Sequence, residues 1–365
     1  MVDPRLEKLA KLCVQYSVYI QPREEVLIRG SEQAFPLINE IYKECLLSDA
    51  YPMIMPNLDV QYTFFKYAKE HQLKFVSKIH KFIHENIDVL ISISCNPNPK
   101  NLTNVNPEKI KKNVASGREL REIFSKCAAE VKLKWTLLPY PIEAQAQEAA
   151  MSIKEYEDFV YSSCLVDKEN PTAEWRKISQ KQEKICIFLN QVNELRIVGE
   201  DTDLTLEIKG RKWINSDGKR NMPSGEVFTA PIEKSANGTI RFTFPGIYSS
   251  REIENIKLTF KNGKVVKASA TKGDELMQQI LKIDGADCIG EAAIGTNYGI
   301  TRFTKNMLFD EKIGGTIHIA LGNAYPETGG LNKSAIHWDL LKDMKNGEIY
   351  ADGESFYKNG RFLAW

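Results

Sequence analysis

The chain has 365 residues, which is enough for two domains that each have their own hydrophobic core. Apolar residues make up 42% of it and charged residues 27%, as in soluble globular proteins. The 49 basic residues nearly balance the 48 acidic ones, so neither a nucleic-acid partner nor a membrane partner is expected.

The cysteines and the first residues indicate a cytoplasmic protein. The seven cysteines are scattered, odd in number and form no CxxC pair, which is typical of reduced thiols. The chain begins Met-Val-Asp-Pro-Arg, which lacks the apolar core of a signal peptide. No run approaches the roughly 20 apolar residues that a membrane-spanning helix needs.

The first half of the chain alternates helical and extended patterns. Strands are predicted at four short apolar runs: residues 25–29, 51–55, 88–94 and 135–138. Helices are predicted where apolar residues recur at helical spacing or a proline opens a long segment: near 6–16, 37–46, 62–68, 107–129 and 173–190. Because strands that alternate with helices form parallel sheets, we predict an α/β domain whose parallel sheet is covered by helices.

The pattern changes near residue 190, where we predict the boundary between a domain of residues 1–190 and a domain of residues 191–365. Five strands are predicted beyond it: residues 195–198, 204–208, 239–244, 256–260 and 264–268. Asn262-Gly263 is a strong hairpin signal between the last two. With a few helices, one of them near residues 273–281, the second domain is predicted to be α+β and rich in strands.

Acids and histidines gather in short, glycine-punctuated segments of this second domain. Only five histidines occur in the chain, and His318 and His337 lie among acids. His337 and Asp339 are one residue apart, so on a strand both would point to the same face and reach one metal ion. His318 interrupts the apolar run of residues 316–321, where a histidine is out of place. Imidazole with carboxylate is a ligand mixture that suits zinc, manganese or cobalt.

Two glutamates also interrupt apolar runs. Glu226 lies in Pro-Ser-Gly-Glu-Val-Phe-Thr-Ala-Pro, and Glu291 follows Ile-Gly. A buried carboxylate is costly unless it is paired or bound to a metal ion. Taken singly, a strand histidine is usually a core residue and a strand glutamate usually faces water. The metal site is favoured because all of these residues occur together in one domain.

Other chemistries have no comparable pattern. His71, His80 and His84 lie in a lysine-rich helical region without an HExxH motif, which favours a solvated helix face. The sequence contains no GxSxG elbow, no GxxxxGK[ST] phosphate loop and no GxGxxG turn. Hydrolysis of an amide at neutral pH remains the chemistry that a carboxylate–histidine set would serve, since two ions about 3.5–4 Å apart activate water and stabilise the intermediate.

Several segments in order resemble the thermophilic aminopeptidase family, the group of aminopeptidases T and S. The resemblance covers the second half, whereas the first half is similar only in its α/β pattern. The segments that carry it are NMPSGEVFTAP at 221–231, LTFKNGKVV at 258–266, IGEAA at 289–293, NMLFDE at 306–311, HIALGNAY at 318–325 and HWD at 337–339.

The resemblance implies a cytosolic exopeptidase that acts on peptides with a free N-terminus. It implies two divalent metal ions (zinc, cobalt, manganese or magnesium), with Glu291 as the bridging ligand and Tyr325 as a catalytic hydrogen-bond donor. It also implies a homodimer that encloses a cavity. The implied metal ligands are Glu226, Glu291, Glu311, His318, His337 and Asp339. The segment from Glu311 to His318 is longer than in bacterial members, which leaves Glu311 the least secure ligand.

Two alternatives stay open at this stage. The first is a two-metal hydrolase that acts on a different amide or ester. The second is a catalytically silent relative that binds peptides through the same cavity.

Overall fold

The computed structural model describes residues 3–249 and 251–364. Their contacts divide the chain into two compact units. The first unit contains the chain up to Thr172 together with Gly218–Pro223. The second contains Ala173–Asp217 and the chain from Ser224 onward. No helix among the described residues is long and apolar enough to cross a membrane.

The first unit contains a four-stranded, fully parallel sheet in the order β2-β1-β3-β4. The two central strands are apolar and mostly buried, as expected for strands covered on both faces. The predicted parallel sheet is therefore confirmed. Its strands are β1 (Glu25–Gly30), β2 (Tyr51–Pro56), β3 (Val89–Ser94) and β4 (Lys134–Pro139).

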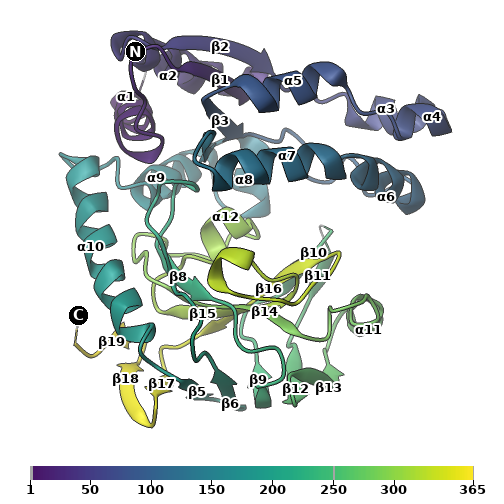
Figure 1. Cartoon of the computed structure of the whole chain (residues 1–365), viewed down its shortest axis with the longest axis vertical. Coiled ribbons are helices and arrows are strands. Elements are labelled where there is room, and N and C mark those ends of the chain that lie inside the picture. Colours follow the sequence, from purple (N-terminus) through teal and green to yellow (C-terminus); the bar gives the residue numbers. More distant parts are fainter. Residues whose placement is uncertain (1–2, 250, 365) are drawn as a thin grey trace. The chain divides into compact units, whose positions relative to one another are not determined.

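Nine α-helices of the described chain belong to this unit, and α5 and α7 run side by side (Figure 1). They are α1 (Pro4–Leu12), α2 (Phe35–Leu47), α3 (Gln61–Tyr67), α4 (Glu70–Leu73), α5 (Lys78–Asn86), α6 (Pro107–Ser116), α7 (Arg118–Ala129), α8 (Glu143–Glu148) and α9 (Ile153–Ser163).

The single helix predicted over residues 107–129 is wrong, because the chain breaks at Gly117. There the backbone leaves helical geometry, with φ −72° and ψ 2°. Arg121 compensates for the break, since its Nη2 donates to the carbonyl of Val114 at 2.7 Å. A carbonyl freed at the end of α6 is thus satisfied by a side chain of α7.

The helix α10 (Pro171–Leu189) groups with the second unit from Ala173 onward, whereas we predicted the boundary at residue 190. The reason is packing, because Ile185, Cys186 and Leu189 are buried in the core of the second unit. Gln182 adds a hydrogen bond, as its Nε2 donates to the carbonyl of Glu226 at 2.9 Å.

The second unit is built from two antiparallel sheets. The larger has the order β13-β12-β9-β6-β5-β17-β18-β19, and the smaller has the order β16-β15-β14-β8-β7. The larger contains β5 (Glu194–Gly199), β6 (Thr202–Glu207), β9 (Asn237–Arg241), β12 (Lys257–Lys261), β13 (Lys264–Ser269), β17 (Glu348–Ala351), β18 (Glu354–Lys358) and β19 (Arg361–Phe362). The smaller contains β7 (Ile214–Ser216), β8 (Glu226–Thr229), β14 (Ile289–Gly295), β15 (Thr316–Gly322) and β16 (His337–Asp343).

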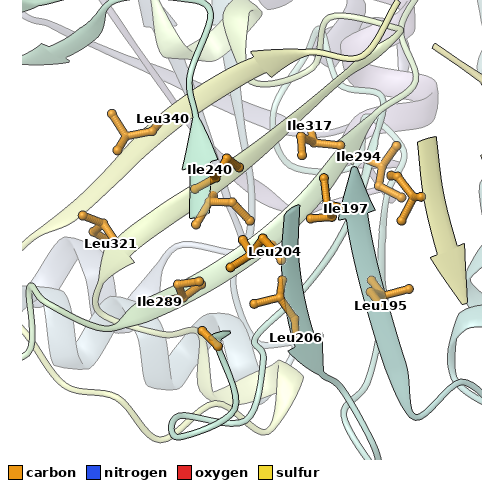
Figure 2. Close-up of a cluster of buried hydrophobic side chains, with 14 of the residues drawn as sticks. Leu195, Ile197, Leu204, Leu206, Ile240, Ile289, Ile294, Ile317, Leu321 and Leu340 are labelled. Atoms are coloured by element: carbon orange, nitrogen blue, oxygen red, sulfur yellow. The ribbon is translucent and has the colours of Figure 1, made fainter. Parts of the chain in front are cut away.

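The apolar core of this unit draws side chains from both sheets. Figure 2 shows Leu204 and Ile240 of the larger sheet together with Ile294, Ile317 and Leu340 of the smaller one. The hairpin β10 (Gly246–Tyr248) and β11 (Arg251–Ile253) and the short helices α11 (Asp274–Ile280) and α12 (Met307–Asp310) complete the unit. The prediction of a strand-rich α+β second half is confirmed.

Candidate metal centre

Five of the six predicted ligands lie on one face of the smaller sheet, spread over four adjacent strands. Residues directly opposite each other on neighbouring strands share a face, and so do residues two apart on one strand. The pairs that establish the shared face are Glu226 with Gly295, Ala293 with His318, Ala320 with Asp339, and Gly322 with His337.

The other face of the same strands supplies the core. Ile317, Ile319 and Leu321 alternate with His318 and Ala320 along β15, and all three isoleucine and leucine side chains are at most 1% exposed. This period of two explains how a histidine can interrupt an apolar run without disturbing the core.

A β-bulge aims Glu291 at the site. The register between β14 and β15 shifts between Ile289 and Glu291, so Gly290 is the extra residue. A Cβ atom at Gly290 would lie 2.4 Å from the carbonyl oxygen of Gly322, which only glycine avoids. The close approach of the two strands therefore depends on Gly290.

Glu311 reaches the site from outside the sheet. It follows α12 directly, and its carbonyl oxygen accepts a hydrogen bond from His318 Nδ1 at 3.1 Å. Single ligand atoms of Glu311, His318 and Asp339 lie within 4.8 Å of one another, as do those of Glu226, Glu291 and His318. The structure thus brings all six predicted ligands together, and the longer segment before His318 does not remove Glu311.

The carboxylate of Glu291 lies between the two imidazoles. Its Oε1 is 3.1 Å from His318 Nε2, and its Oε2 is 3.2 Å from His337 Nε2. His318 Nε2 is also 3.8 Å from Glu226 Oε2, and His337 Nε2 is 3.4 Å from Asp339 Oδ1. One oxygen of Glu291 faces each half of the cluster, which is the arrangement a bridging carboxylate requires.

Backbone carbonyls fix both histidine tautomers. His318 Nδ1 contacts the carbonyl of Glu311, and His337 Nδ1 lies 2.8 Å from the carbonyl of Asn323. A carbonyl only accepts, so each Nδ1 must carry the proton. In the neutral ring this leaves the lone pair on Nε2, which faces the carboxylates, as in protein metal sites.

Two buried oxygens of the cluster are unsatisfied. Glu226 Oε2 and Asp339 Oδ1 have no hydrogen-bond partner within the described part of the chain. An unpaired buried carboxylate oxygen is costly, and a cation would remove that cost. With the mixture of oxygen and Nε2 donors, this observation shows that the residues fit a divalent metal ion.

The charges in the cluster shift one another's pKa values. Burial lowers the pKa of His318, but the hydrogen bond and charge of Glu291 outweigh burial and raise it to about 9. Burial likewise opposes the charge of His337, and Asp339 and Glu291 raise its pKa to about 11. Burial raises the pKa of Glu311 to about 7. In the absence of a metal ion, the imidazoles therefore act as the counter-charges of the carboxylates.

Sequence reasoning missed Lys312, which lies inside the same cluster. Its side chain is fully buried, its Nζ is 3.5 Å from Glu226 Oε1, and it also contacts Glu311 Oε1. Burial lowers the pKa of Lys312, but Glu226 and Glu311 raise it well above the ordinary value. A lysine next to a glutamate is usually a surface pair, so the sequence offers no signal for this position except the Gly314-Gly315 turn that follows.

Tyr325 lies at the more exposed side of the cluster. Its ring centroid is 5.0 Å from that of His337 and 5.7 Å from that of Phe228, and the side chain is 42% exposed. Partial desolvation and the nearby carboxylates of Glu291 and Asp339 raise the pKa of the phenol. The hydroxyl is therefore a proton donor at neutral pH.

The first unit contains a histidine pair and a cavity that are not part of this cluster. His80 and His84 lie on α5, and neither belongs to a potential metal-ligand group among the described residues. A cavity of about 300 Å³ at the carboxyl ends of β1 and β3 includes Ser31, Ser94 and Asn96 in its lining. Its lining contains no histidine and a single carboxylate, Asp59, so it lacks the groups that hydrolysis requires.

Four carboxylates and two oriented imidazoles, five of the six on one sheet face and Glu311 beside it, make up a candidate metalloenzyme centre. The chain belongs to the thermophilic metalloprotease family M29, whose model matches residues 2–362. The predicted family is thus confirmed.

Named relatives cover nearly the whole chain. Aminopeptidase 2 of Geobacillus stearothermophilus is 28% identical over 99% of this chain and 98% of its own length. Aminopeptidase T of Thermus aquaticus is 26% identical over 95% of this chain and 94% of its own length. The solved structure of wild-type AmpT from Thermus thermophilus covers 99% of both chains with a TM-score of 0.85 and 22% identity, which confirms the fold.

Proposed function

We propose that the chain is a metal-dependent aminopeptidase that removes N-terminal residues from peptides at a centre of two divalent ions. The position of Glu291, with one oxygen toward His318 and one toward His337, carries the proposal. Family membership and the names of the relatives support it. Bound ions would lower the pKa of water and polarise the peptide carbonyl.

The ligand residues divide into two groups around Glu291. Glu226, Glu311 and His318 would hold one ion, and His337 and Asp339 the other, since Asp339 Oδ1 is 3.4 Å from His337 Nε2 but 4.0 Å from His318 Nε2. The carboxylates would also attract the α-ammonium group of a peptide, which favours cleavage at a free chain end. The protonated hydroxyl of Tyr325 would donate a hydrogen bond to the oxygen on which negative charge develops.

Replacement of Glu291 by alanine tests this assignment. Since loss of even an outer-shell partner costs 10–100-fold, loss of the bridging ligand should lower kcat/KM at least about 100-fold. Hydrolysis of aminoacyl-anilides and metal content by mass spectrometry would be measured together. Glu275→Ala, an exposed residue on α11, is the matched control. A Glu291→Ala variant with full activity and metal content would refute the proposal.

Substrate profiling separates the alternatives. An aminopeptidase should reject peptides with an acetylated N-terminus, whereas equal cleavage of both forms would indicate another two-metal amide hydrolase. Well under one ion per chain after dialysis against zinc or manganese would indicate a silent peptide-binding relative. The same dialysis with zinc, cobalt, manganese and magnesium would rank the metals, because carboxylate-rich sites accept several.

We further propose that the protein is cytoplasmic and works as a homodimer. The seven cysteines, each in the described part of the chain, form no disulfide with one another, as expected in a reducing compartment. The homodimer rests on the family resemblance, and sedimentation velocity of the purified chain would test it.

A further inference from the structure

A fully buried ammonium group occupies one side of the metal centre. Lysine is almost never fully buried unless it is paired. Lys312 contacts Glu226 Oε1 and Glu311 Oε1, and none of its side-chain surface is exposed. Both partners are carboxylates that the proposed function assigns to the ion on the His318 side.

The backbone holds Lys312 in this position. Its carbonyl accepts a hydrogen bond from the N–H of Asn297 at 3.0 Å, and its own N–H donates to Phe309 O at 3.0 Å. The turn that follows is packed against the end of β14, because a Cβ atom at Gly295 would lie 2.1 Å from the carbonyl oxygen of Ile313. The position of the ammonium group is therefore set by a turn whose backbone is held in place.

The charge of Lys312 makes the two sides of the centre unequal. Among the described ion pairs, its ammonium contacts Glu226 and Glu311 on the His318 side, whereas the pairs of His337 are with Glu291 and Asp339. With neutral imidazoles, four carboxylates and one ammonium leave an excess of negative charge that one divalent ion nearly cancels. A second ion on the lysine side would meet a nearby positive charge.

We infer that Lys312 is a built-in cation that competes with one metal ion for Glu226 and Glu311, so that the centre binds two ions with unequal affinity. This inference rests on the proposed function. The tighter ion occupies the side of His337 and Asp339, and the weaker ion must displace or tolerate the ammonium on the side of His318. Without metal, Lys312 stabilises carboxylates that would otherwise be buried and unpaired.

Zinc titration of the full chain, stripped with chelator and followed by competition with a chromophoric chelator, tests the inference. In the wild type we expect two binding steps whose dissociation constants differ at least about tenfold. Lys312→Met, which keeps an unbranched chain without charge, should tighten the weaker step at least about tenfold and leave the tighter step unchanged. Lys342→Met is the matched control, because Lys342 is also buried but its hydrogen bonds within the described chain are to the carbonyls of Glu200 and Arg241.

Thermal unfolding gives a second readout that does not depend on activity. After chelation, the melting temperature of Lys312→Met should be lower than that of the wild type. Added zinc should raise the melting temperature of Lys312→Met by more than it raises that of the wild type. If Lys312→Met folds only with metal, Lys312→Arg keeps the charge and should retain two unequal steps.

Equal dissociation constants for the two zinc-binding steps of the wild type would overturn the inferred role of Lys312 but not the proposed function. A weaker second step in Lys312→Met than in the wild type would do the same. No zinc uptake by the wild type would overturn the proposed function itself.

Discussion

Pairing between opposite charges explains how the cluster can hold so many buried charged side chains. Each carboxylate of the cluster has at least one cationic or imidazole neighbour, such as His337 for Asp339 and Lys312 for Glu311. Removing one member of a buried ion pair typically costs about 3–5 kcal/mol, because the other member is left unpaired. The residues of the centre are therefore energetically dependent on one another.

Tyr325→Phe should lower kcat about 10²–10³-fold while metal content stays unchanged. The variant removes one hydrogen-bond donor to a developing oxyanion, and such donors contribute effects of this size. Tyr298→Phe is the control, because the hydroxyl of Tyr298 donates to Gly360 O at 2.9 Å, and Gly360 is not a candidate ligand. Steady-state kinetics with metal analysis would check this, and a purely structural role for Tyr325 would instead lower metal content or stability.

His84 should make the first unit less stable in mild acid. Burial and the charge of Arg29 lower the pKa of His84, whose Nδ1 has no hydrogen-bond partner among the described residues. The unfolded chain therefore binds the proton more readily, so stability is present above the unfolded pKa near 6.5 and is lost as pH falls below it.

The measurement is the melting temperature of the full chain between pH 7.5 and pH 5. His84→Gln should lose less stability over this range than the wild type. His80→Gln, at an exposed position on the same helix, should follow the wild type. Identical pH profiles for all three proteins would contradict the prediction.

At the scale of elements, Gly290 and Gly225 set the positions of Glu291 on β14 and Glu226 on β8. Gly225 precedes Glu226 and has φ +113°, and a Cβ atom there would lie 2.7 Å from Asn297 Cβ. Gly225→Ala should therefore combine backbone strain with overpacking, at a cost of about 2–5 kcal/mol. It should also weaken zinc binding by displacing Glu226.

Gly210→Ala is the comparison variant that separates the cost of backbone strain from the cost of overpacking. Gly210 has φ +71°, and no described atom lies within 4 Å of an added Cβ. This variant should lose only about 1–2 kcal/mol and keep its zinc affinity. Urea unfolding and zinc titration of both variants would test the comparison, and equal losses would show that contact with Asn297 is unimportant.

The sequence predicts local structure well where periodicity is strong. The strands at 25–29 and 264–268 match β1 and β13 to within a residue at each end. The helix break at Gly117 was missed, because its compensation by Arg121 is a side-chain contact and not a pattern.

The six candidate ligands came from co-occurrence and from the family resemblance, not from local pattern alone. Pairings such as Glu226 with Gly295 join residues far apart in the chain. The hydrophobic periodicity predicts which residues share a face of one strand. It does not predict which strand lies next to it or in which register the two strands pair. Lys312 was missed for the same reason, since its partner Glu226 is distant in sequence.

At the scale of the whole molecule, metal removal should act on one unit. The six candidate ligands all belong to the second unit. A ligand at 1,000 times its dissociation constant stabilises by about 4 kcal/mol. A unit of this size gains about 2–4 °C per kcal/mol, so chelation should lower its melting temperature by about 10 °C.

Hydrogen exchange would locate the effect. Amides of β14 and β15 should exchange faster after chelation, whereas those of β1 and β3 should keep their protection. Equal loss of protection in all four strands would mean that the two units unfold together.

The segment Gly218–Pro223 affects how the two units can be exchanged between relatives by recombination. It lies between strands of the second unit, yet Leu137 N–H donates to Arg220 O and Met222 N–H donates to Leu137 O, both at 2.9 Å, which places it in the first unit. A single genetic crossover at Thr172 would therefore exchange most of the first unit but leave behind six residues fitted to the old one. Recombination between distant relatives should seldom succeed at that point, so the two units are expected to be inherited together.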